Sequence, residues 1–276
     1  MEENLSALID EAVDFVRKRV ETRPEIGIVL GTGLGEGALT SELKARARIP
    51  YEEIPHFPCS TVESHAGNLI LGELRGREVV VMSGRVHYYE GYTMREVTFP
   101  IRTLRGLGAT TLIISSAVGG MNPMMRRGEI VCVVDHINLM GDNPLIGKND
   151  DALGPRFPDM SEPYSRELIE SAERNALRLG LPLNKGVLVG VAGPNLETRA
   201  EYRFLRGLGA DIVGMSMVPE NIAAVHAGMR VLGLSVITDE CFPDALKPVD
   251  IAEILRTAAE AEPKLARLVC EIVKEA

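Results

Sequence analysis

The first twenty residues place apolar and charged positions in the order expected of an α-helix. Apolar side chains recur at helical spacing with acidic or basic residues between them, at Leu5, Leu8, Ile9, Ala12, Val16 and Val20. Because one helical turn takes 3.6 residues, these side chains fall on one face. The pattern predicts an amphipathic helix over residues 5–20.

Eight short apolar runs follow, and most are rich in the β-branched residues that favour strands. They lie at residues 26–30, 69–74, 78–83, 111–116, 130–135, 187–192, 211–215 and 230–238. Helical patterns occupy residues 94–107, 166–179, 196–208 and 219–227, and a last helix is expected at 251–274. This alternation predicts an α/β fold whose sheet is covered by helices on both faces.

A short turn between two of the runs indicates that the sheet is mixed. Arg75-Gly76-Arg77 joins the runs at 69–74 and 78–83 closely enough to form a hairpin, which makes those two strands antiparallel. Residues 141–163 show no period, and such long loops in compact domains are often functional. We therefore expect one domain, residues 1–276, with a central mixed β-sheet flanked by helices.

Charge and cysteine usage narrow the possible partners. The net charge of -9 argues against nucleic acid, because an acidic surface repels a phosphate backbone. No apolar run approaches the roughly 20 residues of a membrane span, so no membrane partner is expected. No two of the four cysteines have the close spacing of a zinc or redox motif: Cys59, Cys132, Cys241 and Cys270. We therefore expect free thiols in a reducing cytoplasm.

The first candidate for chemistry is the turn Gly31-Thr32-Gly33-Leu34-Gly35, which follows the run at 26–30. A glycine turn after a strand exposes backbone N–H groups that can hold an anion, although a plain tight turn explains it equally well. A dinucleotide fingerprint would require glycine where Glu36 stands, and the Lys-Ser/Thr of a Walker loop is missing. A non-catalytic dinucleotide-binding protein is therefore the weaker alternative.

The second candidate is the segment from Gly84 to Tyr92, again at the end of a predicted strand. Arg85 and His87 are two residues apart, so in an extended chain their side chains point to the same side. A guanidinium presents a planar fork to phosphate oxygens, and an imidazole adds a donor. The alternative is a solvated arginine beside a structural histidine.

Further polar residues follow other predicted strands. Ser216 precedes Pro219, which suits the first turn of a helix, so Ser216 is either an anion ligand or a helix cap. Glu197 and Asp239 each lie beyond a strand end, where carboxylates are as often solvated as functional.

Together these segments resemble the trimeric purine nucleoside phosphorylases, a family that also contains methylthioadenosine phosphorylase. The resemblance runs from about Ile26 to Thr238, and the motifs keep the family's order and spacing. They are Gly31 to Gly35, His65-Ala66-Gly67, Gly84 to Tyr92, Ala117 to Asn122, Asp135-His136-Ile137-Asn138, Ala192 to Thr198 and Val213 to Glu220.

The resemblance implies a phosphate site assembled from separate loops. Its members are Thr32, His65, Arg85, His87, Ser216 and the backbone at Ala117. This agrees with the anion chemistry argued above from the residues alone. Inorganic phosphate is then a co-substrate, and neither a metal nor a cofactor is implied.

The resemblance also implies where the nucleoside binds. Tyr89 and Met215 contact the ribose, with Ile251 beside its 5′ end, and the base pocket comprises Ala117, Leu196, Glu197, Val213, Gly214 and Asp239. Leu196 stands where the family usually has Phe, and Glu197 pairs with the N1–H side of a 6-oxopurine. Phe157 matches an aromatic residue that reaches into the neighbouring subunit's site, which implies a homotrimer.

Two departures from the family pattern leave the preferred nucleoside open. Asp239 replaces an Asn of the 6-oxopurine enzymes and resembles the adenine-accepting branch. Ile251 lies where those enzymes usually place a His for the 5′-hydroxyl, and an apolar side chain there would tolerate a 5′-methylthio group. Glu197 argues the other way, because methylthioadenosine phosphorylases carry a small hydroxyl residue at that point.

The expected reaction is phosphorolysis of a purine nucleoside, with His87, Glu197 and Asp239 as catalytic residues. Bound phosphate attacks the anomeric carbon, which gains oxocarbenium character, and the departing base takes a proton or hydrogen bond at N7. Asp239 can supply it only if burial and the neighbouring Glu240 raise its pKa. Methylthioadenosine or adenosine phosphorolysis is the alternative activity.

Overall fold

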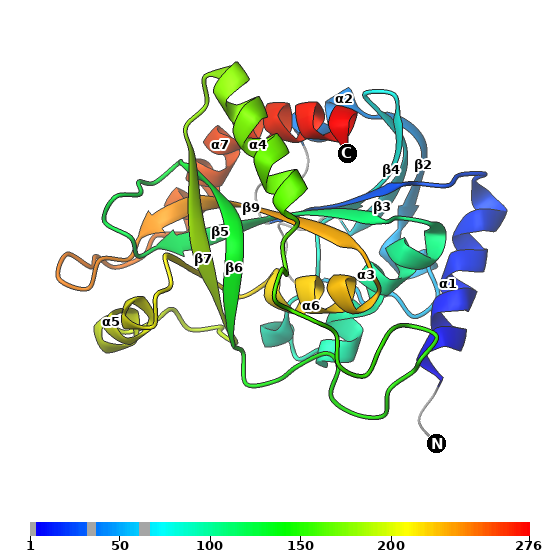
Figure 1. Ribbon diagram of the computed structural model, residues 1–276, viewed down its shortest axis with the longest axis horizontal. Coiled ribbons are helices and arrows are strands. Elements are labelled where there is room, and N and C mark those ends of the chain that lie inside the picture. The colour runs from blue at the N-terminus through cyan, green and yellow to red at the C-terminus, as the bar shows by residue number, and fades with distance from the viewer. Residues whose placement is uncertain (1–3, 32–36, 61–66) are drawn as a thin grey trace.

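A computed structural model of the protein describes residues 4–31, 37–60 and 67–276, and these form a mixed sheet flanked by helices (Figure 1). The sheet has nine strands in the order β2-β3-β4-β1-β5-β8-β7-β6-β9. Their bounds are β1 Ile26–Leu30, β2 Lys44–Pro50, β3 Asn68–Leu74, β4 Arg77–Ser83, β5 Thr111–Gly120, β6 Ile130–Leu139, β7 Leu183–Val191, β8 Ile212–Gly214 and β9 Arg230–Glu240. The expected fold class is confirmed.

Strand directions bring several chain segments to one edge of the sheet. β1 runs parallel to β4 and to β5, and β5 runs parallel to β9, so the carboxyl ends of these four strands meet. Since β5 pairs with β8 as well as with β9, the strands β5, β8, β7, β6 and β9 close into a ring. The ring and the parallel strands beside it share the edge at which ligands bind in open α/β sheets.

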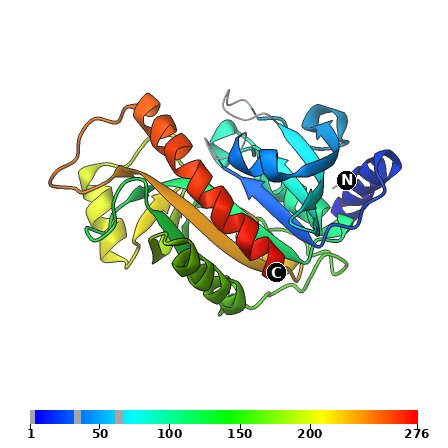
Figure 2. The same ribbon diagram turned by 90° about the horizontal axis from the view of Figure 1, so that it is seen from above.

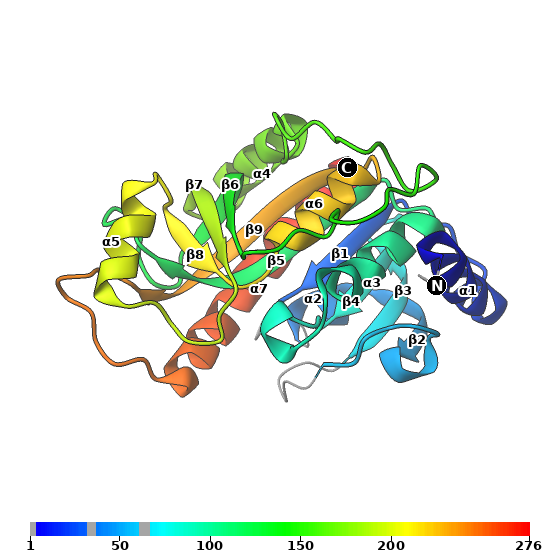
Figure 3. The same cartoon turned by 90° about the horizontal axis from the view of Figure 1, so that it is seen from below.

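Helices cover both faces of the sheet, and their bounds are α1 Leu5–Arg19, α2 Ala38–Glu42, α3 Met94–Leu107, α4 Arg166–Leu179, α5 Arg199–Gly207, α6 Val218–His226 and α7 Ile251–Glu275. Seen from above, α4 and α7 lie across one face (Figure 2). Seen from below, α3 packs between α1 and α6 on the opposite face (Figure 3). Every residue of β1 is buried as a result, which explains its unbroken apolar run.

The turn between β3 and β4 is the predicted hairpin. Leu74 pairs with Arg77, so the connection consists of Arg75 and Gly76 alone. Both have positive φ, 52° and 87°, as a type I′ turn requires, and glycine adopts this conformation without a steric cost.

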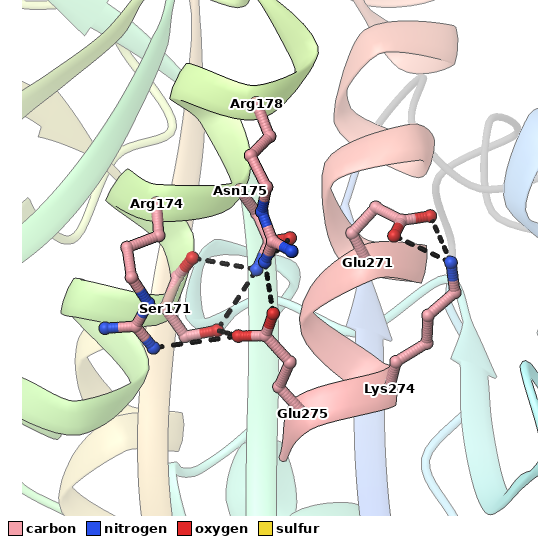
Figure 4. Close-up of polar contacts among 7 residues, drawn as sticks. All are labelled: Ser171, Arg174, Asn175, Arg178, Glu271, Lys274 and Glu275. Carbon is pink, nitrogen blue, oxygen red and sulfur yellow. Dashed lines mark hydrogen bonds and ion pairs between the residues drawn. The ribbon is translucent and has the colours of Figure 1, made fainter.

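Polar contacts at the end of the chain fix α7 against α4 (Figure 4). The carboxylate of Glu275 accepts a hydrogen bond from Ser171 Oγ at 2.7 Å and pairs with Arg178, while Arg174 lies 3.6 Å away. These contacts lower the pKa of Glu275, chiefly through the Ser171 hydrogen bond. The far end of α7 is thereby held while its first turn faces the carboxyl ends of the strands.

The structure differs from the sequence prediction at elements whose patterns are weak. β2 was not predicted, because this edge strand is mostly exposed to solvent and its exposed residues include three basic ones, Lys44, Arg46 and Arg48. α5 begins at Arg199 rather than at residue 196, because Thr198 caps it and Glu201 completes a capping box. β5 and β6 each continue four residues beyond the predicted ends, into polar or glycine-rich sequence.

None of the described helices is both long enough and apolar enough to cross a membrane. The four cysteines are free thiols, of which Cys59 is exposed and the other three are buried.

Candidate active site

A cleft of about 170 Å³, partly open to solvent, lies where the four parallel strands end. It collects residues from seven separated stretches of the chain. The predicted site residues that line it are Arg85, His87, Tyr89, Ala117, Leu196, Glu197, Val213, Gly214, Met215, Ser216 and Asp239. The candidate residues from distant loops therefore share a common centre.

Four predicted site residues are not among those lining the cleft. Thr32 and His65 fall outside the described residues, although Gly31, next to Thr32, lines the cleft. Ile251 is 61% exposed, and Ile254, one turn later in α7, lines the cleft instead. Phe157 is 88% exposed on the long loop.

Sequence reasoning missed two buried polar residues that line the cleft together with Glu197 and Asp239. Tyr202 and Cys241 also line it, and each is only 1% exposed. Tyr202 lies one helical turn after the Thr198 cap, and Cys241 follows Asp239 by two residues, yet neither position carries a motif. Only the packing of α5 against the end of β9 reveals them.

One end of the cleft is built around a buried ion pair. Arg85 Nη1 donates to Glu220 Oε2 at 2.8 Å, and the two side chains are 2% and 3% exposed. Arg85 Nη2 donates to the carbonyl of Ser115, whereas the buried Nε has no hydrogen-bond partner among the described atoms. The interpretation of Arg85 as a solvated side chain is therefore wrong, and Glu220 fixes its guanidinium in place.

His87 lies beside Arg85 and is neutral near pH 7. Its ring stacks on Tyr89 at 4.8 Å between centroids, and Nδ1 lies 3.0 Å from Glu90 Oε1. Burial, followed by the charge of Arg85, lowers the pKa of His87 to about 4 despite the contact with Glu90. A neutral ring that donates from Nδ1 to Glu90 carries its lone pair on Nε2, so Arg85 supplies the positive charge at this end.

Ser216 enters the cleft from a strained turn at the start of α6. Met217, which follows it, is fully buried with a positive φ of 60°, a conformation unusual for a residue with a side chain. Met217 is the N-cap, so the interpretation of Ser216 as a cap is wrong, and Pro219 occupies the first turn as predicted. One short segment thus presents Ser216 to the cleft and Glu220 to Arg85.

The end of the cleft opposite Arg85 holds two carboxyl groups, Glu197 and Asp239. Asp239 Oδ2 accepts from Cys241 Sγ at 2.9 Å, and Oδ1 accepts from Thr238 Oγ1 at 3.1 Å. Burial raises the pKa of Asp239. Burial also raises the pKa of Glu197, and the charge of Asp239 adds to that shift. No described cation lies within ion-pair distance of either group, so no ion pair offsets the burial of these two carboxyls.

In the part of the chain that the structure describes, no three His, Cys, Asp or Glu side chains are arranged to hold a metal ion.

Comparison with known proteins assigns the family. A family model described as Phosphorylase superfamily matches residues 25–274. The chain is 46% identical to purine nucleoside phosphorylase 1 of Bacillus subtilis over 97% of its length and 98% of that protein's. It is 45% identical to the purine nucleoside phosphorylase of Mus musculus, covering 92% and 90% of the two chains. The chain belongs to the purine nucleoside phosphorylases.

Solved structures of purine nucleoside phosphorylases share the whole fold. A schistosome purine nucleoside phosphorylase in complex with hypoxanthine superposes with a TM-score of 0.90 at 39% identity, covering 97% of this chain and 96% of that one. The Schistosoma mansoni enzyme in complex with adenosine gives a TM-score of 0.91 at 39% identity and the same coverage. As a purine nucleoside phosphorylase, this chain is a pentosyltransferase.

Proposed function

We propose that this chain cleaves purine ribonucleosides and 2′-deoxyribonucleosides with phosphate, in purine salvage, giving the free base and ribose or deoxyribose 1-phosphate. The observation that carries the proposal is the shared cleft, with Arg85, His87 and Ser216 at one end and Glu197 and Asp239 at the other. The matched residues 25–274 support one catalytic domain. Phosphate is the only co-substrate in this proposal, with no metal or cofactor.

Phosphate is held at the Arg85 end in this proposal. Arg85, Ser216 and the backbone at Ala117 donate to it, His87 Nε2 accepts the O–H of protonated phosphate, and Thr32 and His65 adjoin the site. Glu220 fixes the guanidinium before phosphate arrives, so little reorientation is needed on binding. Holding a nucleophile in attack geometry contributes on the order of 7 kcal/mol in well-aligned cases.

The base leaves at the other end of the cleft. A phosphate oxygen forms a bond to C1′ while the C1′–N9 bond breaks, and the electron pair passes into the purine ring. Protonated Asp239 donates to N7, and ionised Glu197 accepts N1–H of a 6-oxopurine. The raised pKa of Asp239 supports its role as a donor, because burial disfavours a second negative charge beside ionised Glu197.

The sugar lies between the two ends. Tyr89 and Met215 line the cleft there and are proposed to contact the ribose, with Ala117, Leu196, Val213 and Gly214 around the base. Ile251 is proposed to lie near the 5′ substituent, and Ile254, on the same helix and in the cleft lining, supports an apolar contact at this point.

Phosphorolysis of methylthioadenosine or adenosine is the second candidate. Asp239 favours it, because a carboxylate accepts a hydrogen bond from the 6-amino group of adenine. Glu197 favours 6-oxopurines, because a carboxylate accepts N1–H. Both groups line the same cleft, so substrate assays must separate the two activities.

The test is base release with and without phosphate. The protein is incubated with inosine, guanosine, adenosine or methylthioadenosine, and free base and sugar 1-phosphate are measured. Phosphate-dependent release of hypoxanthine or guanine is expected. Equal release without phosphate would indicate a hydrolase, and adenine release from methylthioadenosine alone would favour the second candidate.

We further propose that the protein acts as a cytoplasmic homotrimer in which Phe157 completes a neighbouring subunit's site. The support is a large aromatic side chain left 88% exposed on the long loop, while free thiols fit a reducing compartment.

The trimer proposal predicts an effect of Phe157 on substrate binding without an effect on folding. Phe157→Ala is expected to raise the nucleoside KM about tenfold, since burying an aromatic ring contributes roughly 1.5–3 kcal/mol, and to leave the Tm unchanged. Leu177→Ala removes another side chain, 83% exposed on α4, and serves as the matched control. A monomeric mass in solution would contradict the proposal.

A further inference from the structure

The segment that follows β1 is fixed at its first residue by a buried serine. Gly31 lines the cleft, and its N–H donates to Ser115 Oγ at 3.1 Å. The same hydroxyl donates to the carbonyl of Val29, within β1, at 3.1 Å. Ser115 is 2% exposed, and a Cβ at residue 31 would lie 2.7 Å from its carbonyl oxygen. The two backbones therefore approach this closely only because residue 31 is glycine.

Ser115 also connects Gly31 to the guanidinium in the cleft. Its carbonyl oxygen accepts from Arg85 Nη2, while its side chain accepts from the Gly31 N–H. Arg85 and Gly31 come from separate segments, one after β4 and one after β1, and both line the cleft. One residue of β5 therefore fixes these two segments relative to each other, although Ser115 itself is not among the residues lining the cleft.

A carboxylate from α7 fixes the chain again at the start of α2. Glu262 Oε1 accepts from the N–H groups of Gly37 at 2.9 Å and Ala38 at 3.0 Å. The first N–H groups of a helix have no partner within the helix, and the N-cap residue Gly37 has no side chain that could supply one. Glu262 therefore caps α2 from a helix far away in the sequence.

Glu262 acts from a helix that is itself held in place. α7 packs against α2 and β9, and Glu275 fixes its far end against α4. Near the start of α7, Ile254 lines the cleft. Glu262 and Ser115 line one small cavity, of about 10 Å³, between α7 and the strands β1 and β5. The two contacts with the segment after β1 therefore belong to one packed region.

We propose that Ser115 and Glu262 are positioning residues that prepare the cleft for phosphate. The first fixes Gly31 and the second fixes Gly37. Between these described ends the sequence contains Thr32, a proposed phosphate ligand. This inference rests on the proposed function and adds two residues that act through this segment. Groups already held in place lose less conformational freedom when a ligand binds, so releasing either end should weaken phosphate binding more than nucleoside binding.

The first test removes the carboxylate. Glu262→Ala leaves the N–H groups of Gly37 and Ala38 to water, since the first residue is exposed and the second half-buried, so folding should be little affected. We expect the Kd for inorganic phosphate, measured by calorimetric titration without nucleoside, to rise about tenfold, because two hydrogen bonds to a charged acceptor are lost. The phosphate KM should rise by the same factor, while the inosine KM should change by less than about twofold.

Charge alone predicts the opposite result for this variant. Removing a negative charge makes the protein less acidic and would strengthen anion binding. Glu260→Ala removes an exposed carboxylate from the same helix and is the matched control, expected to leave phosphate binding unchanged. Glu262→Gln loses the charge but keeps an oxygen that can accept from both N–H groups, so it should restore phosphate binding close to that of the wild type.

The second test releases the other end of the segment. Ser115→Ala leaves the Gly31 N–H and the Val29 carbonyl without this buried partner, so the Tm should fall and the phosphate Kd should rise. Ser115→Thr keeps the hydroxyl and should bring the phosphate Kd back toward that of the wild type.

Because Ser115→Ala can unfold the protein, the outcome is decided by Glu262→Ala. An unchanged phosphate Kd in that variant, or equal rises in the phosphate KM and the inosine KM, would overturn the inference. A wild-type protein that binds phosphate but releases no base from any purine nucleoside would overturn the proposed function instead, and the phosphate titrations would still test both positioning residues.

Discussion

The charged side chains at the two ends of the cleft differ in how they are paired. At the end proposed to bind phosphate, Arg85 and Glu220 form an ion pair whose side chains are 2% and 3% exposed, so the geometry is fixed before a ligand binds. At the end proposed to bind the base, Glu197 and Asp239 have no described cation within ion-pair distance, and burial raises the pKa of both. A rigid, charge-balanced end suits the proposed phosphate, while buried carboxyls without a fixed cation suit the proposed hydrogen bonds to a purine.

Breaking the ion pair between Arg85 and Glu220 should have the largest effect on phosphate binding and on stability. Arg85→Ala removes the proposed phosphate ligand and leaves Glu220 buried without its partner, which costs roughly 3–5 kcal/mol of unfolding free energy. We expect the phosphate KM to rise about a hundredfold or more, measured by initial rates at saturating nucleoside, because a charge-assisted bidentate contact is lost.

Arg85→Lys distinguishes an effect on phosphate binding from an effect on folding. It retains a positive charge beside Glu220 but loses the planar fork, so the phosphate KM should still rise while the Tm falls less. Arg174→Ala, which removes a 59% exposed side chain of α4, is the control. Unchanged phosphate affinity in Arg85→Lys and Arg85→Ala together would defeat the placement of phosphate at this end.

The neutral histidine at the same end predicts a pH dependence of stability. The pKa of His87 falls from an ordinary value of 6.5 to about 4 on folding, so the unfolded chain binds more protons between these values. The contribution of neutral His87 to the free energy of unfolding is fully present above pH 6.5. It is lost as the pH falls toward 4, by up to about 3 kcal/mol. Denaturant titrations across this window should show a shallower slope in His87→Gln than in the wild type, and identical slopes would contradict the buried, neutral state.

Sequence patterns predicted the side chains at strand ends but not their partners. Arg85 and His87 were identifiable because they directly follow an apolar strand, and α3 was predicted to the residue by its amphipathic pattern. Glu220 lies 135 residues from Arg85, so no local pattern reveals that pair. Tyr202 and Cys241 were missed for the same reason, since they meet only where α5 packs near the end of β9.

Edge and loop positions were also beyond prediction. β2 lacks the apolar run that marks a buried strand, because one side of an edge strand faces solvent. Leu196 was assigned to a helix, yet it precedes the Thr198 cap and lines the cleft from a loop. The spacing of apolar residues indicates which side chains are buried. The structure of β2 is set by its neighbouring strand and that of the loop at Leu196 by the Thr198 cap, so this spacing predicts neither.

The smallest effect is expected from Asp239→Asn, which tests how the two carboxyl groups distinguish inosine from adenosine. Asp239→Asn replaces a carboxyl group with an amide that always donates through its nitrogen, so in the proposed binding mode N7 of a 6-oxopurine keeps its donor. The 6-amino group of adenine loses its carboxylate acceptor, and a hydrogen bond to a charged group contributes roughly 1.5–3 kcal/mol, so the ratio of inosine to adenosine kcat/KM should rise about tenfold or more. The amide oxygen can still accept from Cys241 Sγ, and Thr238 Oγ1 can donate to the Val118 carbonyl, 3.3 Å away, instead of to residue 239, so folding should be little affected. An unchanged ratio, with phosphate KM also unchanged, would remove Asp239 from base recognition and leave Glu197 alone to distinguish the two classes of purine.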